Sequence, residues 1–185
     1  VRPKVGLALG GGGARGFGHL GAIKAFEELG VEFDAVAGTS VGAFIGALYC
    51  YGYKADELIE RALKMKIKDI RTSKIVFVPS KTSKYEEFII SLMGDIDISD
   101  LKKKFGAVAV DMKTGEEIVF TEGRLCKAIA GSCAVPMVFD CVQYEGMNLM
   151  DGGLANTIPA DVPKMLGCDK VISVDINKYR GRGTD

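Results

Sequence analysis

The chain has 185 residues, with 24 basic and 24 acidic side chains and a formal net charge of zero. A general nucleic-acid binder draws on a surplus of lysine and arginine for phosphate contacts, so this composition argues against one. No apolar stretch reaches the roughly 18 residues of a membrane span. The five cysteines are scattered and never in Cys-x-x-Cys spacing, so we expect small buried thiols in a reducing compartment and no zinc site.

Short apolar runs alternate with helical patterns along the chain. In chain order we predict a strand at 4–9, a helix at 17–29, a strand at 34–37, helices at 41–51, 55–66 and 85–93, strands at 105–111 and 116–121 joined by a hairpin turn, a helix at 125–131, an extended run at 148–150, a helix at 162–166 and a last buried strand at 171–176. This alternation predicts a three-layer α/β/α fold with a central, mostly parallel sheet. No repeat or low-complexity linker interrupts it, so we expect one domain over 1–185 with its core at about 4–176.

The most informative motif is Gly38-Thr39-Ser40-Val41-Gly42, which lies between a predicted strand and a predicted buried helix. Gly-x-Ser-x-Gly in this context is typical of a nucleophilic serine on a sharp turn, with glycine where strand and helix pack too closely for side chains. A serine needs a base to take its proton, and that base is commonly a later histidine. The lone histidine, His19, precedes the serine. Either Ser40 is a structural turn residue or another side chain is the base.

A glycine-rich loop, Gly10 to Gly16, joins the first strand to the first helix. Its exposed backbone N–H groups suit two kinds of ligand. One is the oxyanion of an acyl-transfer intermediate. The other is a dinucleotide, since Gly11 to Gly16 fits Gly-x-Gly-x-x-Gly and Asp34 lies near the position of a ribose-binding acid.

The third motif is Asp151-Gly152-Gly153, which follows the extended run at 148–150. Asp-Gly-Gly is first of all a turn sequence. It also offers a carboxylate at a strand end, where sites in parallel sheets gather. We therefore expect Ser40, the glycine loop and Asp151 to share one edge of the sheet.

Together, and in this order, the three motifs resemble the signature of the patatin-like phospholipase family. The small-residue run at 130–136, the hairpin turn at 111–115 and the closing segment at 167–175 are also similar to family segments. The resemblance extends from about Lys4 to Asp175, and the chain fits either a domain fragment or a compact bacterial-type member.

The resemblance implies a serine lipid acyl hydrolase of the phospholipase A, lysophospholipase or esterase type that works through an acyl-enzyme. It implies a Ser-Asp dyad, with Ser40 as nucleophile and Asp151 as base, and it implies neither a cofactor nor a metal. The other implied roles are an oxyanion hole at Gly11, Gly12 and Gly13, loop support from Arg15 and Gly16, elbow glycines at Gly38 and Gly42, and an acid motif completed by Gly152 and Gly153. His19 is then a packed, hydrogen-bonded residue near the site.

Two further expectations concern partners and alternatives. The segment 64–84 interleaves basic and apolar residues, which suits either a peripheral contact with an anionic membrane or a solvated helix end followed by a buried strand. With a lipid or fatty-acyl ester as substrate, we expect a cytoplasmic protein with peripheral contact at the inner membrane surface. The alternative function is a non-hydrolytic, dinucleotide-binding Rossmann-type domain. A conventional histidine triad is disfavoured, because no histidine follows position 19.

Overall fold

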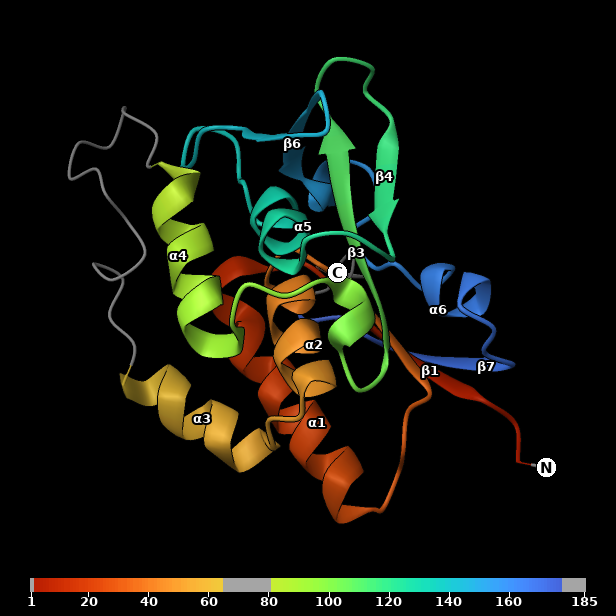
Figure 1. Cartoon of the computed structure of the whole chain (residues 1–185). Coiled ribbons are helices and arrows are strands. Elements are labelled where there is room, and N and C mark those ends of the chain that lie inside the picture. Colours follow the sequence, from red (N-terminus) through yellow and green to blue (C-terminus); the bar gives the residue numbers. More distant parts are fainter. Residues whose placement is uncertain (1, 65–80, 178–185) are drawn as a thin grey trace, which may run out of the picture.

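A twisted sheet runs through the centre of the molecule, with helices on both faces (Figure 1). The computed structural model describes residues 2–64 and 81–177. Within these residues the strand order is β5-β6-β3-β2-β1-β7, and β4 also pairs with β3. The strands are β1 (Val5–Leu9), β2 (Ala35–Thr39), β3 (Lys104–Asp111), β4 (Glu117–Phe120), β5 (Val142–Tyr144), β6 (Met147–Asp151) and β7 (Lys170–Val174).

One face of the sheet carries most of the helices. There α1, α2 and α5 lie near the sheet, with α3 outside α1 and α4 outside α5, while α6 lies on the opposite face (Figure 1). The α-helices are α1 (Phe17–Glu28), α2 (Val41–Tyr51), α3 (Ala55–Lys64), α4 (Thr82–Met93), α5 (Leu125–Ser132) and α6 (Val162–Met165). Short 3-10 turns are η1 (Gly13–Gly16), η3 (Ile98–Asp100) and η4 (Gly152–Leu154).

The centre of the sheet is parallel. Strand β1 pairs in parallel with β2 and β7, and β2 pairs in parallel with β3. Antiparallel pairs of β3 with β4 and β6, and of β5 with β6, extend the sheet at one side. The structure thus confirms the predicted layered fold around a mostly parallel central sheet.

The hydrophobic core is strongly asymmetric. Apolar side chains of alternate strand residues, such as Leu7 and Phe105, join the main cluster beneath α1, α2 and α5. On the other face, Ala37 and Val108 meet only a small cluster with Val162 of α6. The fold is therefore stabilised mainly on the face that also carries the strand-to-helix turns.

Several local predictions differ from the structure. Strand β5 was missed, because three residues are too few to show a period. Strand β7 was predicted to be buried, but it is an edge strand with half-exposed side chains, including Ile172 at 36%. Helix α4 begins at Thr82, three residues before the predicted start. Most of the segment expected to contact a membrane, residues 65–80, lies outside the described residues.

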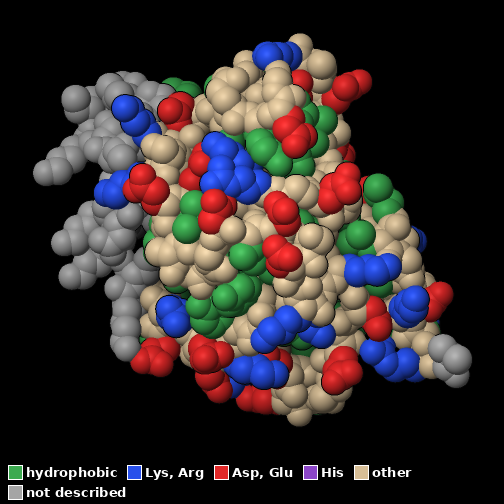
Figure 2. All heavy atoms as spheres, viewed as in Figure 1, with side chains coloured by type: hydrophobic (Ala, Val, Ile, Leu, Met, Phe, Trp, Pro, Cys, Tyr) green, Lys and Arg blue, Asp and Glu red, His purple; other side chains and the backbone are tan. Residues whose placement is uncertain are grey.

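The described surface carries charges of both signs. Figure 2 shows basic and acidic side chains interspersed over one face, which agrees with the zero net charge. Among the described helices, none combines the length and the apolar character that crossing a bilayer requires.

The turn from β2 into α2 is the tightest packing in the fold. A methyl group added at Gly42 would lie 2.1 Å from the carbonyl oxygen of Leu9, and one at Gly38 would lie 2.3 Å from the backbone of Gly42. The partners are backbone atoms and cannot rotate away. Glycine is needed at both positions because β1, β2 and α2 approach one another backbone to backbone.

We therefore predict that Gly42→Ala destabilises the protein by about 3 kcal/mol or more, because the added methyl group must displace β1 or α2. Urea unfolding monitored by circular dichroism measures the change. The matched control is Gly21→Ala in α1, where an added methyl group meets no atom within 4 Å. That change should stabilise the helix by about 0.5–1 kcal/mol. Equal stability of Gly42→Ala and wild type would contradict the packing described.

Candidate active site

Ser40 lies on the turn between β2 and α2 in a strained backbone conformation. Its φ of 55° and ψ of −126° lie in a region that non-glycine residues rarely adopt. Such strain costs on the order of 1–3 kcal/mol and persists only where the surroundings enforce it. Here the Ser40 N–H donates to Oγ of Ser132 at 2.9 Å, and its carbonyl accepts the N–H of Ala43 at 2.9 Å to begin α2. The serine is thus presented at the helix N-terminus, as the motif predicts.

Strand pairing brings Asp151 to the same place. Residues 107–108 of β3 pair with both β2 and β4, and residues 109–110 pair with both β4 and β6. Since a strand has two edges, β2 and β6 must occupy consecutive stretches of one edge of β3. Thr39 ends β2 opposite Val108, and Asp151 ends β6 opposite Ala109. The residue after β2 and the last residue of β6 therefore meet.

The Asp151 carboxyl group is buried and only partly hydrogen-bonded. Its Oδ1 accepts the N–H of Gly153 at 2.8 Å, and its own N–H donates to the carbonyl of Ala134 at 3.0 Å. Burial raises the pKa of Asp151, while the adjacent Ser40 hydroxyl and the Gly153 N–H lower it in part. The other carboxyl oxygen, Oδ2, is buried and has no hydrogen-bond partner among the described residues. The carboxyl group thus keeps a free acceptor close to the Ser40 hydroxyl that lowers its pKa.

Two side chains from α4 and the segment after α5 surround this carboxyl group. The Tyr85 hydroxyl donates to Sγ of Cys133 at 3.5 Å. Burial raises the pKa of both groups, and the nearby Asp151 adds to each shift. Both therefore stay neutral next to the carboxylate. The Tyr85 hydroxyl and the Cys133 thiol thus form an uncharged wall of the site.

The glycine loop lies directly over the serine. A methyl group at Gly11 would contact Cβ of Ser40 at 3.5 Å, which places this part of the loop against Ser40. The N–H of Gly11 is already donated to the carbonyl of Thr157 at 2.9 Å. For the N–H groups of Gly12 and Gly13, no acceptor is found in the described part of the chain. Of the three predicted oxyanion donors, Gly11 is therefore engaged elsewhere, which the glycine pattern could not reveal.

Arg15 and Gly16 fix the shape of this loop. The backbone N–H of Arg15 donates to the Gly12 carbonyl at 3.2 Å, and its side-chain Nε donates to the same oxygen at 3.3 Å. Gly16 packs on the start of α2, where an added methyl group would lie 2.4 Å from Cγ2 of Val41. The Gly12 carbonyl is thus occupied within the loop, whereas the N–H groups of Gly12 and Gly13 have no acceptor in the described part of the chain.

His19 is a fully buried residue of α1 that contacts the loop from behind. Its Nε2 lies 2.6 Å from the carbonyl oxygen of Gly10 and therefore carries the proton as donor. Burial lowers the pKa of His19, against smaller opposite effects of the Gly10 contact and of Asp175. The imidazole is neutral and bonded to the backbone rather than to Ser40.

The dinucleotide alternative required Asp34 near the glycine loop. Asp34 instead precedes β2, where it accepts the N–H of Val5 at 2.8 Å and binds the side chain of Arg2. The glycine loop follows the opposite end of β1. A ribose held at the glycine loop would lie a full strand length away from Asp34, so the geometry does not support this alternative.

Sequence reasoning missed the groups that hold the site from the second half of the chain. Oγ of Ser132 accepts the N–H of Ser40, and the carbonyls of Asn156 and Thr157 accept Thr39 Oγ1–H and the Gly11 N–H. A signal for Ser132 was present in the small-residue run at 130–136, which matched the family without indicating a role. The contacts made by the backbone carbonyls of Asn156 and Thr157 do not depend on side-chain type, so no sequence pattern indicates them.

Comparison with known proteins agrees with this geometry. Residues 7–164 match the family model described as patatin-like phospholipase. The chain is 34% identical over 183 residues to human patatin-like phospholipase domain-containing protein 6, covering 93% of the chain and 13% of that protein. It is 32% identical over 182 residues to an NTE family protein of Mycobacterium bovis, covering 95% of the chain and 49% of that protein. The chain thus spans half or less of these relatives.

Solved structures support the fold. VipD from Legionella pneumophila superposes with a TM-score of 0.73 at 14% identity, over 86% of this chain and 47% of that one. A chain in the SpcU–ExoU complex of Pseudomonas aeruginosa gives a TM-score of 0.52 at 16% identity, over 74% of this chain and 39% of that one. With the family model matching most of the sequence and the relatives above 30% identity, the chain belongs to the patatin-like phospholipase family.

Proposed function

We propose that this domain hydrolyses fatty-acyl esters of lipids through an acyl-enzyme on Ser40, with Asp151 as general base. The observation that carries the proposal is the pairing of a strained serine with a buried carboxyl group whose Oδ2 has no hydrogen-bond partner within residues 2–64 and 81–177. A base must lie within reach of the proton that it removes, and a raised pKa makes a carboxylate a better base. Both conditions are supported by the geometry of the site.

The reaction then proceeds in two acyl transfers. Oγ of Ser40 attacks the ester carbonyl carbon while its proton passes to Oδ2 of Asp151. The N–H groups of Gly12 and Gly13 stabilise the oxyanion, and the proton then leaves with the alcohol as the ester bond breaks. Asp151 next takes a proton from water, whose oxygen attacks the acyl carbon and releases the acid and Ser40. Every proton is returned at the end of the cycle.

Reaction with a fluorophosphonate probe tests the nucleophile. We expect the wild type to be labelled and Ser40→Ala to be unlabelled. Hydrolysis of p-nitrophenyl esters should fall by at least about 10³-fold in both Ser40→Ala and Asp151→Asn, because the two residues act as a unit. Ser91→Ala, an exposed serine of α4, is the matched control and should change neither readout. Labelling of Ser40→Ala at the wild-type rate would refute the proposal.

The pH dependence follows from the raised pKa of Asp151. As a base it must be ionised, so kcat/KM should fall on the acid side with an apparent pKa above about 3.9, the usual value for an aspartate. In the folded state the raised pKa adds stability below the unfolded pKa, and this contribution is lost as the pH rises through the folded value. Asp151→Asn should therefore be at least as stable as wild type at pH 7.5.

Thermal unfolding at pH 4 and pH 7.5 measures this linkage. The difference in Tm between Asp151→Asn and wild type should be more favourable to the variant at the higher pH, where the wild-type carboxylate is charged and buried. If the difference in Tm favoured the wild type more at pH 7.5 than at pH 4, the fold would stabilise the charged form of Asp151, contrary to the prediction.

His19 should be dispensable for the chemistry. We expect His19→Ala to keep substantial esterase activity, because its ring binds the Gly10 carbonyl and not the nucleophile. The loss of this buried hydrogen bond should lower the free energy of unfolding by about 1–3 kcal/mol. Initial rates and thermal melting of the same preparation separate the two effects. A folded His19→Ala as inactive as Ser40→Ala would argue against a two-residue mechanism.

A further inference from the structure

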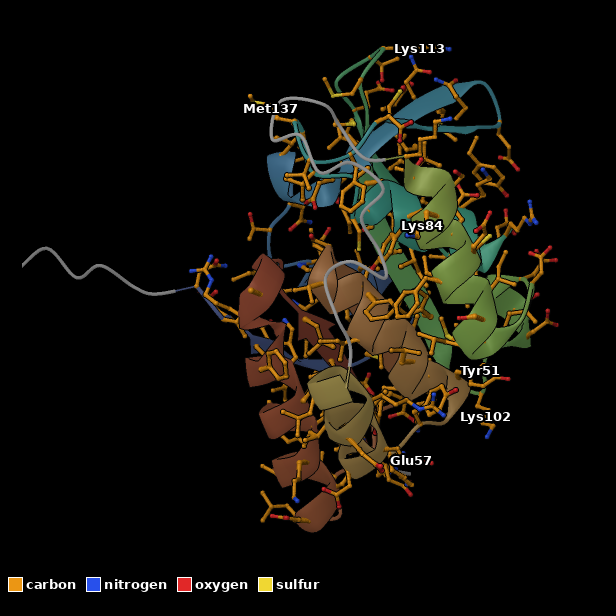
Figure 3. The ribbon with its side chains drawn as sticks, turned by 90° about the vertical axis from the view of Figure 1, so that its left-hand side faces the viewer. Tyr51, Glu57, Lys84, Lys102, Lys113 and Met137 are labelled. Atoms are coloured by element: carbon orange, nitrogen blue, oxygen red, sulfur yellow. The ribbon has the colours of Figure 1, made fainter. Side chains whose placement is uncertain are left out.

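An apolar groove of about 430 Å³ lies between α1, α2, α3 and α4. Figure 3 shows this side of the molecule, with α2 between α1 and α4 and with α3 across the lower end. Almost all of its lining is apolar, and Arg61 is the single charged residue among the lining side chains of the described chain. The larger side chains that line it are Phe17, Leu20, Phe44, Ile45, Leu48, Leu58, Phe88 and Leu92.

One end of the groove lies beside the turn that holds the proposed nucleophile. Gly13 of the glycine loop and Val41, the residue after Ser40, both belong to the lining. In α4 the residue nearest the site is Tyr85, which contacts Cys133 beside Asp151. The groove thus ends next to the turn that holds Ser40, which places an acyl chain on Ser40 within reach of the groove.

From there the groove follows α2 away from the site. Its lining residues on this helix are Val41, Phe44, Ile45 and Leu48, which recur on one face at helical spacing. On α4 the lining residues are Phe88 and Leu92, which lie about one and two turns beyond Tyr85. Helices α2 and α4 therefore line the groove along its length.

Helix α3 crosses the far end. Its first turn is tied to the later part of α1, since Lys24 Nζ lies 2.7 Å from Asp56 and the N–H of Ala55 donates to Glu27 at 3.2 Å. The α3 residues Leu58, Arg61 and Ala62 line the groove. The guanidinium of Arg61 lies 4.8 Å from the ring centre of Tyr53. The Tyr53 hydroxyl in turn donates to the Leu92 carbonyl at 2.8 Å, so this end is closed by a connected set of side chains.

We propose that this groove binds the acyl chain of the substrate and that α3 sets the length of the chain that fits. This inference rests on the proposed function, because Ser40 fixes where the chain begins. From Val41 to Leu48 the groove runs about 10 Å at 1.5 Å per helical residue. An extended chain with bonds of about 1.5 Å advances about 1.25 Å per bond along its zigzag, so the groove holds about eight carbons. With the carbonyl carbon and its neighbour at Ser40, the acyl chain that fits has on the order of ten carbons. The preferred esters are therefore those of medium-length fatty acids.

A series of p-nitrophenyl esters from C4 to C16 tests the length limit. In the wild type, kcat/KM should rise to a maximum near C10 and then level off or fall. Ala62→Phe narrows the far end, because Ala62 is half-buried and faces the groove. It should lower the C10-to-C4 ratio of kcat/KM at least tenfold. Leu92→Ala should move the maximum to longer chains.

Leu63→Phe is the matched control, since Leu63 is the next residue of α3, is 74% exposed and does not line the groove. This variant should keep the wild-type profile. A C10-to-C4 ratio that is unchanged by Ala62→Phe, or changed equally by Leu63→Phe, would overturn the proposal.

A binding measurement tests the groove independently of the hydrolytic reaction. Ser40→Ala is titrated with sodium decanoate by calorimetry, and the double variant Ser40→Ala with Ala62→Phe is titrated in parallel. The groove proposal predicts at least tenfold weaker binding in the double variant. If the wild type hydrolysed no ester, the proposed function would fail while this comparison still decided the groove. Equal decanoate affinity in both variants would refute the groove even if hydrolysis were observed.

Discussion

The structure depends on the close approach of three backbones where β1, β2 and α2 meet. Gly42 brings the start of α2 against the carbonyl of Leu9, and Gly38 leaves room for that helix above its own strand. No side chain mediates this contact. The angle at which α2 leaves the sheet is therefore set by van der Waals contact, and the strained backbone of Ser40 follows from it. The glycine loop gains its position in the same way, because it packs on the start of that helix at Gly16.

The second constraint is that β2 and β6 share one edge of β3. A parallel strand delivers the serine, and an antiparallel strand entering from the opposite direction delivers the carboxylate. Neither residue needs a long loop to reach the other. A short buried strand positions each partner, which explains how a carboxyl group can be held beside a hydroxyl with one oxygen left unbonded.

Hydrophobic periodicity and glycine spacing were enough to predict the elements around the candidate site. The strands and helices around Ser40 were recognised because apolar runs end at glycine motifs, and Asp151 was singled out because it follows a strand and precedes two glycines. Strand β5 was not predicted because three residues are too few to show a period. The shared edge of β3 was not predicted because pairing between strands that are distant in the sequence leaves no such mark. The occupied N–H of Gly11 and the contact from Ser132 also depend on segments far away in the chain. The exposure of β7 was mistaken because an apolar run looks the same at the edge of a sheet as at its centre.

The strand that carries Asp151 has a further consequence for partly unfolded molecules. Strands β5 and β6 form a hairpin whose turn residues, Glu145 and Gly146, both have positive φ, so this unit is held together by local contacts. It attaches to the rest of the sheet through only the last residues of β3. If the hairpin detached, Asp151 would leave with the strand and Ser40 would lose the carboxyl group beside it. Local opening of this kind would therefore remove the proposed base without unfolding the whole domain.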